Sequence, residues 1–197
     1  MKKILLSLLI VLSLFTVTGC EANNKTTSND SNNTSNEIKE NNKSVVLYFS
    51  ATGTTKSIAN RIAKESNSDI IEIIPKEKYK SEDLDYNSDC RANREQKDSK
   101  ARPEIENKID ITKYDTIYLG YPIWWGTNPK IILTLLDTYD FTDKVIIPFC
   151  TSGSTDISAS VNDLKNYNSS LTIKDGKRFS TSDTDETIIE FIKNNGR

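Results

Sequence analysis

The sequence predicts a single α/β domain built on a doubly wound, five-stranded parallel β-sheet with helices on both faces. Short, unbroken apolar runs alternate along the chain with segments in which apolar residues recur at helical spacing. Loops rich in hydroxyl, glycine or aromatic residues directly follow three of the apolar runs. A length of 197 residues suits one ordinary domain plus a tail and is too short for two full domains.

Four apolar runs predict the principal strands. They are Val45–Phe49, Ile70–Ile74, Thr116–Tyr121 and Val145–Phe149. Each is a continuous run of Val, Ile, Leu, Tyr and Phe rather than an alternation of apolar and polar residues, which is typical of parallel strands covered on both faces. A weaker fifth strand is predicted near Ser170–Ile173.

Four helices are predicted between and after these strands. Their periodic apolar positions are Ile58, Ala59, Ile62 and Ala63; Ile131, Ile132, Leu135 and Leu136; Ile157, Val161 and Leu164; and Ile188, Ile189 and Ile192. We expect Asn128 to cap the second helix, with Pro129 in its first turn. The pair Asp183 and Glu186 has the spacing of a capping box for the last helix.

One long stretch, Pro75–Asp110, shows no clear period. It is polar, includes "DLDYNSDCRANREQKDSKARPEI" and could contain a short helix. Loops of this length are usually functional or disordered.

The first residues have the order of a secretory signal. Two lysines precede an apolar run that is short for a membrane-spanning helix, and the run ends in small residues before Cys20. The ending "VTGC" resembles a bacterial lipobox, so we expect residues 1–19 to be a signal peptide and Cys20 to carry a lipid. Residues 20–43 are too polar to fold and predict a tether, which leaves 44–197 for the folded domain.

Composition narrows the classes of function. The net charge is −2 and the basic residues are scattered, which argues against a nucleic-acid partner. The chain has no histidine, which excludes Ser-His-Asp and Cys-His catalysis and imidazole metal sites. Any chemistry would therefore come from a cofactor.

Three loops are expected to meet at the carboxyl edge of the sheet, where open α/β sheets bind ligands. They are "SATGTT" (Ser50–Thr55), Tyr121–Asn128 with both tryptophans, and Cys150–Asp156. The first follows a buried strand and opens a helix, so its amides and hydroxyls suit a phosphate. Because no lysine follows Gly53 as in a Walker A loop, a phosphomonoester fits better than a triphosphate with magnesium. The plainer alternatives are loops that only cap helices and tryptophans that only fill the core.

In order and spacing, the segments "SATGTT", "YPIWWG" and "PFCTSG", together with "DYNSDCRANREQKDSKARPEI", resemble the flavodoxin family. The similarity covers about Lys43 to Asn194. The resemblance implies strand order 2-1-3-4-5 with FMN at the switch point, as known for flavodoxins.

The resemblance also implies the binding residues, with no metal and no catalytic side chain. The FMN phosphate would lie at Ser50, Thr52, Gly53, Thr54 and Thr55; the ring system against Pro122, Ile123, Trp124, Trp125 and Gly126; and its edge at Thr151, Ser152 and Gly153. Cys90 and Cys150 are expected to stay unpaired, with Cys150 partly buried. Tyr79–Arg102 is expected to be a solvated, charge-rich loop, the alternative being that it covers the flavin edge or binds a partner.

The function implied is that of a membrane-tethered flavodoxin. It would bind FMN non-covalently and carry electrons between redox partners on the outer face of the cytoplasmic membrane. The alternatives are an FMN-dependent NAD(P)H quinone or nitro reductase of the same fold, and a lipoprotein that only captures flavin.

Overall fold

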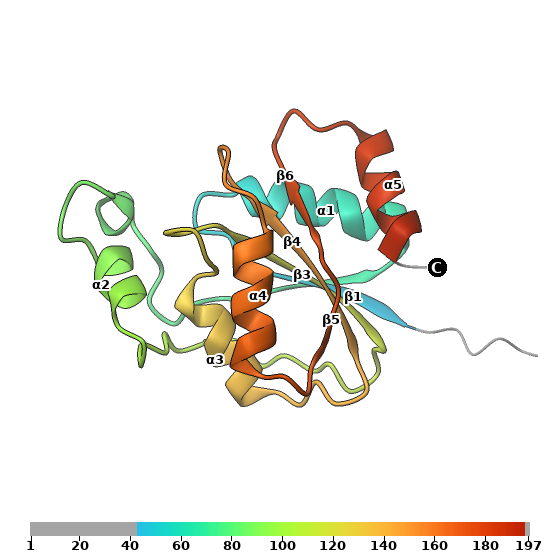
Figure 1. Cartoon of the computed structure of the whole chain (residues 1–197), viewed down its shortest axis with the longest axis horizontal. Helices are drawn as coiled ribbons and strands as arrows, with labels where there is room; N and C mark the ends of the chain where they lie inside the picture. The colour runs from blue at the N-terminus through green and yellow to red at the C-terminus, as the bar shows by residue number, and fades with distance from the viewer. Residues whose placement is uncertain (1–42, 196–197) are drawn as a thin grey trace, which may run out of the picture. The chain divides into compact units, whose positions relative to one another are not determined.

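The computed structural model describes residues 43–195, which form a parallel β-sheet with helices on both faces (Figure 1). The strands are β1 (Ser44–Tyr48), β2 (Asp69–Glu72), β3 (Thr116–Pro122), β4 (Val145–Thr151), β5 (Thr172–Ile173) and β6 (Lys177–Phe179). Their order is β2-β1-β3-β4-β5, and β6 also pairs with β4. This confirms the doubly wound sheet and its expected order.

Two core clusters cover the two faces of the sheet. On one face α1 (Thr54–Ser66) and α5 (Asp185–Asn195) pack against alternate residues of β1, for example Val46 and Tyr48. On the other face α3 (Lys130–Thr138) and α4 (Ser158–Tyr167) share a cluster with Val45 and Leu47. The central strands are therefore buried on both sides, which is why their sequences are continuously apolar.

Strand β2 departs from this pattern because it lies at the edge of the sheet. It was expected over Ile70–Ile74, but it begins at Asp69 and ends at Glu72, and Ile70 is exposed. An edge strand has a partner on one side only, and here Asp69–Glu72 pairs with β1. The expectation of cover on both faces was wrong for this strand.

The fifth strand of the expected sheet is split into two. β5 pairs with Val145 and Ile146, and β6 resumes the pairing at Phe149. Pro148 lies in the gap and has no N–H to donate to a neighbouring strand. The chain bulges opposite it at Gly176, which has φ +74° and whose absent Cβ would lie 2.4 Å from the Pro148 carbonyl oxygen. The prediction near Ser170–Ile173 thus found β5 and missed β6.

The helices are present where the apolar spacing predicted them, but two predicted caps were wrong by one residue. The cap position of α3 is Pro129, and the Asn128 side chain donates to the Pro129 carbonyl instead of capping the helix. At α5 the backbone N–H of Thr187 donates to the Thr184 hydroxyl. Asp183 instead accepts from the backbone N–H of Ser180 and closes the preceding turn.

The segment between β2 and β3 makes a closed excursion beyond the carboxyl ends of the strands (Figure 1). It contains a 3₁₀ turn, η1 (Ser81–Leu84), and the short helix α2 (Arg91–Lys97). An antiparallel bridge between Pro75 and Ile105 closes its neck. The long polar stretch is therefore an ordered loop with its two ends pinned together.

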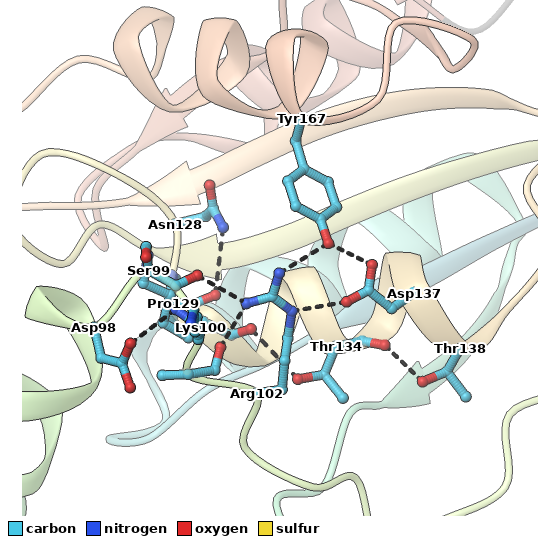
Figure 2. Close-up of polar contacts among 12 residues, drawn as sticks. Asp98, Ser99, Lys100, Arg102, Asn128, Pro129, Thr134, Asp137, Thr138 and Tyr167 are labelled. Carbon is cyan, nitrogen blue, oxygen red and sulfur yellow. Dashed lines mark hydrogen bonds and ion pairs between the residues drawn. The ribbon is translucent and has the colours of Figure 1, made fainter.

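Arg102 fixes the return of this excursion to the body of the domain (Figure 2). Its guanidinium donates to Asp137 of α3 at 2.7 Å and to the Tyr167 hydroxyl of α4 at 2.9 Å. The Tyr167 hydroxyl in turn donates to Asp137, which closes a three-residue network. The excursion is thus attached to two helices of one face.

Parts of the sequence interpretation fall outside the described residues. These are the signal peptide, Cys20 and the tether as far as residue 42. Within residues 43–195, none of the helices combines the length and the apolar character that crossing a membrane requires.

We predict that Gly176→Ala destabilises the fold by about 1–3 kcal/mol, because it adds left-handed strain and a clash with the Pro148 carbonyl. Denaturant unfolding measures this change. Gly153→Ala is the matched control, since no atom lies within 4 Å of its added Cβ. An equal loss in both variants would contradict this account of the bulge.

Candidate functional site

A pocket of about 530 Å³ opens at the carboxyl ends of β1, β3 and β4. This is the size of a small-molecule or cofactor site. Its walls are Ala51, Thr52, Thr54, Thr55, Leu84, Tyr86, Pro122, Ile123, Trp124, Thr151, Ser152, Gly153, Phe179, Ser180 and Thr181. All three loops singled out in the sequence contribute, as expected from strands that end at one edge.

The first loop leaves the start of α1 free for a ligand. Gly53 occupies the cap position in a left-handed conformation (φ +89°), and no side chain within residues 43–195 caps the helix. The Ser50 hydroxyl instead accepts from the backbone N–H of Gly53 at 3.1 Å. The hydroxyls of Thr52 and Thr54 lie 3.3 Å apart. Because the first amides of α1 have no side-chain partner, the arrangement fits an anion better than a loop that only caps its helix.

A buried hydrogen bond joins the first and third loops. The hydroxyls of Thr55 and Thr151 are 2.8 Å apart, and both side chains are buried. A buried hydroxyl without a partner would destabilise the fold, so this pair holds the two loops at a fixed separation.

The aromatic loop gives its two tryptophans different environments. Trp124 is 4% exposed and makes edge contacts with Phe49 and Tyr79, yet it also lines the pocket. Trp125 is 44% exposed and does not line it. The alternative that the tryptophans only fill the core therefore does not hold: Trp124 packs in the core and also lines the pocket, and Trp125 is exposed.

A tight hairpin turn produces this difference. Trp124 and Thr127 exchange two backbone hydrogen bonds, and the residues between them, Trp125 and Gly126, have φ +50° and +81°. Positive φ at both central residues defines a type I′ turn. For a bulky residue such as Trp125 this conformation costs about 1–2 kcal/mol.

The excursion between β2 and β3 supplies a wall that the binding-residue prediction did not include. Leu84 and Tyr86 line the pocket, and the Tyr86 ring lies 4.5 Å from that of Trp125 between centroids. The two apolar residues of "DLDY" within an otherwise polar stretch were the available signal. The alternative that this segment covers one side of the pocket agrees with its position.

The segment Tyr79–Arg102 is charge-rich and largely exposed, as expected, but it is not only a solvated loop, because it contains η1 and α2 and has a buried side. Its residues Cys90, Ala92 and Asn93 are buried. The Tyr79 hydroxyl donates to Glu95, and the Arg91 guanidinium lies 4.3 Å from the Tyr79 ring centroid. Burial, reinforced by the Glu95 carboxylate, raises the pKa of Tyr79.

The third loop is supported by β6. Arg178 donates to the Ser152 carbonyl at 3.3 Å, and the next three residues, Phe179, Ser180 and Thr181, line the pocket. No apolar run around residues 177–179 is long enough to predict this strand. Within residues 43–195, Cys90 and Cys150 are not joined by a disulfide, and Cys150 is fully buried rather than partly buried as expected.

Most of the predicted binding residues line the pocket. Those that do not are Ser50, Gly53, Trp125 and Gly126, which shape the first loop and the hairpin turn. The residues that the prediction did not include are Ala51, Leu84, Tyr86, Phe179, Ser180 and Thr181.

The sheet and pocket define an α/β protein that binds its ligand at the point where strand order reverses. The family model for flavodoxin matches residues 43–195, and the chain belongs to that family.

Two solved structures are similar over nearly their full length, and both were assigned as flavoproteins. One from Bacteroides eggerthii shares 36% identity over 80% of this chain and 99% of its own, with a TM-score of 0.76. One from Bacteroides uniformis shares 39% identity over 77% and 98%, with a TM-score of 0.75.

A more distant structure was solved with a flavin. It is a Lactobacillus acidophilus flavoprotein in complex with FMN, with 28% identity over 70% of this chain and 93% of its own and a TM-score of 0.54. No curated protein matches the chain.

We predict that the protein loses stability as pH rises above about 9. Burial raises the pKa of the Cys150 thiol from 9.0 to about 12, so the unfolded chain releases this proton first. Between those values the free energy of unfolding falls by about 1.4 kcal/mol per pH unit for this one group. Urea unfolding at a series of pH values measures the slope. Cys150→Ala reduces it between pH 9 and 10, and an unchanged slope in that variant would refute the assignment.

Proposed function

We propose that this protein is an electron-carrying flavodoxin that binds FMN in the pocket described above. The observation that carries the proposal is one pocket with two chemically different ends. The uncapped start of α1 lies at one end, and Pro122, Ile123 and Trp124 form an apolar wall. FMN has a phosphate for the first and a flat apolar ring system for the second. The FMN complex of the Lactobacillus flavoprotein supports the same cofactor.

The residues present fit FMN. Thr52, Thr54 and the amides of the first loop would hold the phosphate with neutral donors. Trp124 would lie against the ring system, and Thr151 and Ser152 would meet its edge. Bound FMN accepts and releases electrons singly or in pairs, which this chain's own side chains do not do.

The chain's contribution is to set the surroundings of the ring. Its apolar wall disfavours added negative charge in the pocket, and two acidic residues, Glu82 and Asp83, directly precede the lining residue Leu84. A flavin held here would be a low-potential carrier, because its reduced form gains negative charge. No proton transfer by a side chain is needed.

We further propose that the domain is exported and anchored to the outer face of the cytoplasmic membrane through a lipid on Cys20. The basic and apolar segment before this cysteine supports the anchor. The tether would join the domain at the start of β1, whereas the pocket lies at the other end of that strand. Five residues of strand, about 16 Å, then separate the attachment point from the pocket.

An FMN-dependent NAD(P)H quinone or nitro reductase is the second candidate. It is favoured by the position of Leu84 and Tyr86, which bring the excursion to the pocket and could form part of a second substrate site. Rapid reduction of bound FMN by NADH or NADPH alone would select the reductase over the carrier. A lipoprotein that only captures flavin would show no electron exchange with any donor.

We predict that Thr52→Ala weakens FMN binding about ten- to a hundredfold and leaves riboflavin binding unchanged. The hydroxyl would donate to the phosphate, and a hydrogen bond to a charged group contributes about 1.5–3 kcal/mol. Titration of the flavin-free protein, followed by flavin fluorescence, measures both affinities. Ser57→Ala removes an exposed hydroxyl of α1 outside the pocket and serves as the control. An equal loss of affinity for FMN and for riboflavin would show that Thr52 does not contact the phosphate. If FMN does not bind to the unaltered protein, the proposed function is refuted.

We predict that Cys20→Ala abolishes incorporation of a fatty-acid probe and releases the protein from the membrane fraction. A lipid anchor needs this thiol, and no other residue of the segment can replace it. Cys90→Ala is the control and keeps its label. Unchanged labelling of the Cys20→Ala variant would contradict the anchor.

A further inference from the structure

The loop between β6 and α5 brings hydroxyl groups from the last part of the sequence to the pocket. Ser180 and Thr181, the two residues that follow β6, line the pocket together with Thr54 and Thr55 of α1. Figure 1 shows this loop leaving β6 and returning as α5, which packs beside α1. Hydroxyls from two distant segments of the chain therefore meet in one pocket.

Thr151 of β4 links the end of β6 to the first turn of α1. It pairs with Phe179 in the register of β4 and β6, and neighbouring strands lie about 4.8 Å apart. Its hydroxyl lies 2.8 Å from that of Thr55, the second residue of α1. Because Thr181 follows two residues after Phe179, this link places it close to the start of α1.

Arg61 of α1 holds the same loop from its other end. Its guanidinium donates to the backbone carbonyl of Asp183 at 2.7 Å and to the Asp185 carboxylate at 2.8 Å. The loop is also closed on itself, since the backbone N–H of Ser180 donates to the Asp183 carboxylate at 2.7 Å. The chain is therefore fixed on both sides of Thr181 by contacts that involve no ligand.

Thr181 is the residue of this loop that is placed to bind a ligand. It is exposed, and within residues 43–195 neither its hydroxyl nor its N–H has a hydrogen-bond partner. Its neighbour Ser180 differs, because the Ser180 hydroxyl lies 2.8 Å from that of Ser182 and its N–H is used by Asp183. Thr181 thus offers the pocket two donors that the fold itself does not use.

The pocket offers a phosphate neutral donors. Among the described residues, none of the side chains that line it carries a charge. Lys56, in the first turn of α1, instead lies with its Nζ 3.1 Å from the Glu72 carboxylate. A hydrogen bond to an ionised group is stronger than one between neutral groups, so each further neutral donor matters for an anion held in this way.

From these observations we propose that Thr181 binds the FMN phosphate together with the first loop, and that Arg61 is the residue that positions it. The inference rests on the proposed function, because it assigns a second segment of the chain to the phosphate of that cofactor. Two loops from distant parts of the sequence would then hold one phosphate. Thr181, like Thr52, would distinguish FMN from riboflavin.

Thr181→Ala tests the contact directly, by titration of the flavin-free protein followed by flavin fluorescence. We expect FMN binding to weaken about tenfold, because a hydrogen bond to a charged group is lost, and riboflavin binding to stay the same. Thr181→Ser retains the hydroxyl and keeps most of the affinity for FMN. Ser182→Ala removes the adjacent exposed hydroxyl, which does not line the pocket, and leaves both affinities unchanged.

The ³¹P signal of bound FMN reports on the phosphate itself. We expect it to move in Thr181→Ala relative to the unaltered protein and to stay in place in Ser182→Ala. A change confined to the ring system would leave this signal where it is, so the measurement separates a phosphate contact from a general loosening of the pocket.

Arg61→Ala tests the positioning role. We expect it to weaken FMN binding about three- to tenfold and to spare riboflavin binding, because the phosphate alone loses a contact. In the Thr181→Ala background, Arg61→Ala causes little further loss, since both changes remove the same interaction. Lys64→Ala, which removes an exposed cation of α1, is the control and leaves the affinity for FMN unchanged.

Unchanged FMN affinity in Thr181→Ala, or equal losses for FMN and riboflavin, would overturn the assignment of Thr181. Additive losses in the double variant would refute the role of Arg61. If FMN does not bind to the unaltered protein, the proposed function fails, and the ¹⁵N-labelled, flavin-free protein is titrated with inorganic phosphate. A saturable shift of the Thr54 and Thr181 amide signals together then supports an anion site made by two loops, and a titration in which Thr181 does not shift refutes it.

Discussion

The register of β3 between β1 and β4 is the constraint on which the site depends. Tyr48 of β1 pairs with Gly120, and two residues further along Pro122 pairs with Thr151 of β4. Parallel strands end at the same edge, so this register brings three loops from distant parts of the sequence to one level. The buried hydrogen bond between Thr55 and Thr151 then locks the first loop to the third. A shift of one residue in either pairing would separate the phosphate loop from the apolar wall.

The sequence predicted those parts of the fold that local patterns determine. Continuous apolar runs specify the central strands because both faces of the sheet are covered, and the loops after them follow directly. The outer strands were harder to predict for a physical reason. β2 is exposed on one side, and the fifth strand is interrupted where Pro148 cannot donate a hydrogen bond and Gly176 must approach its carbonyl closely. The sequence pattern predicted β5 near Ser170. It did not predict β6, because the break between β5 and β6 depends on Pro148 of β4.

The site was predictable where one loop supplies it and unpredictable where distant segments meet. The phosphate loop and the third loop were found because each is a short segment after a strand. Tyr86 was missed because its place beside Trp125 is set by the amides of α2 and by the closed neck of the excursion. Trp124 and Trp125 are adjacent residues of the same type. The left-handed turn at Trp125 leaves the Trp124 ring buried in the pocket wall and the Trp125 ring exposed. Residue propensities do not predict which of the two tryptophans is exposed. The glycine of the "WG" dipeptide only indicates that a tight turn can form there.

The excursion also explains how a short helix can have a large effect on the site. The helix α2 has seven residues and is too short to be stable alone, so tertiary contacts must hold it. Cys90 accepts the N–H of Asn93 at its start, and the Tyr79 ring packs against the guanidinium of its first residue, Arg91. Arg102 attaches the segment that follows it to α3 and α4. The side-chain oxygens of Asn93 and Gln96 are buried without a hydrogen-bond partner within residues 43–195, which costs stability. The side-chain amide nitrogens of Asn93 and Gln96 donate to the backbone at Tyr86 and next to Trp125. The loss of stability therefore falls on the two residues that position the Tyr86 and Trp125 rings. The polar residues of this stretch resembled a solvated loop in the sequence. Some of them, such as Asn93 and Gln96, instead hold the neighbouring backbone in place through hydrogen bonds.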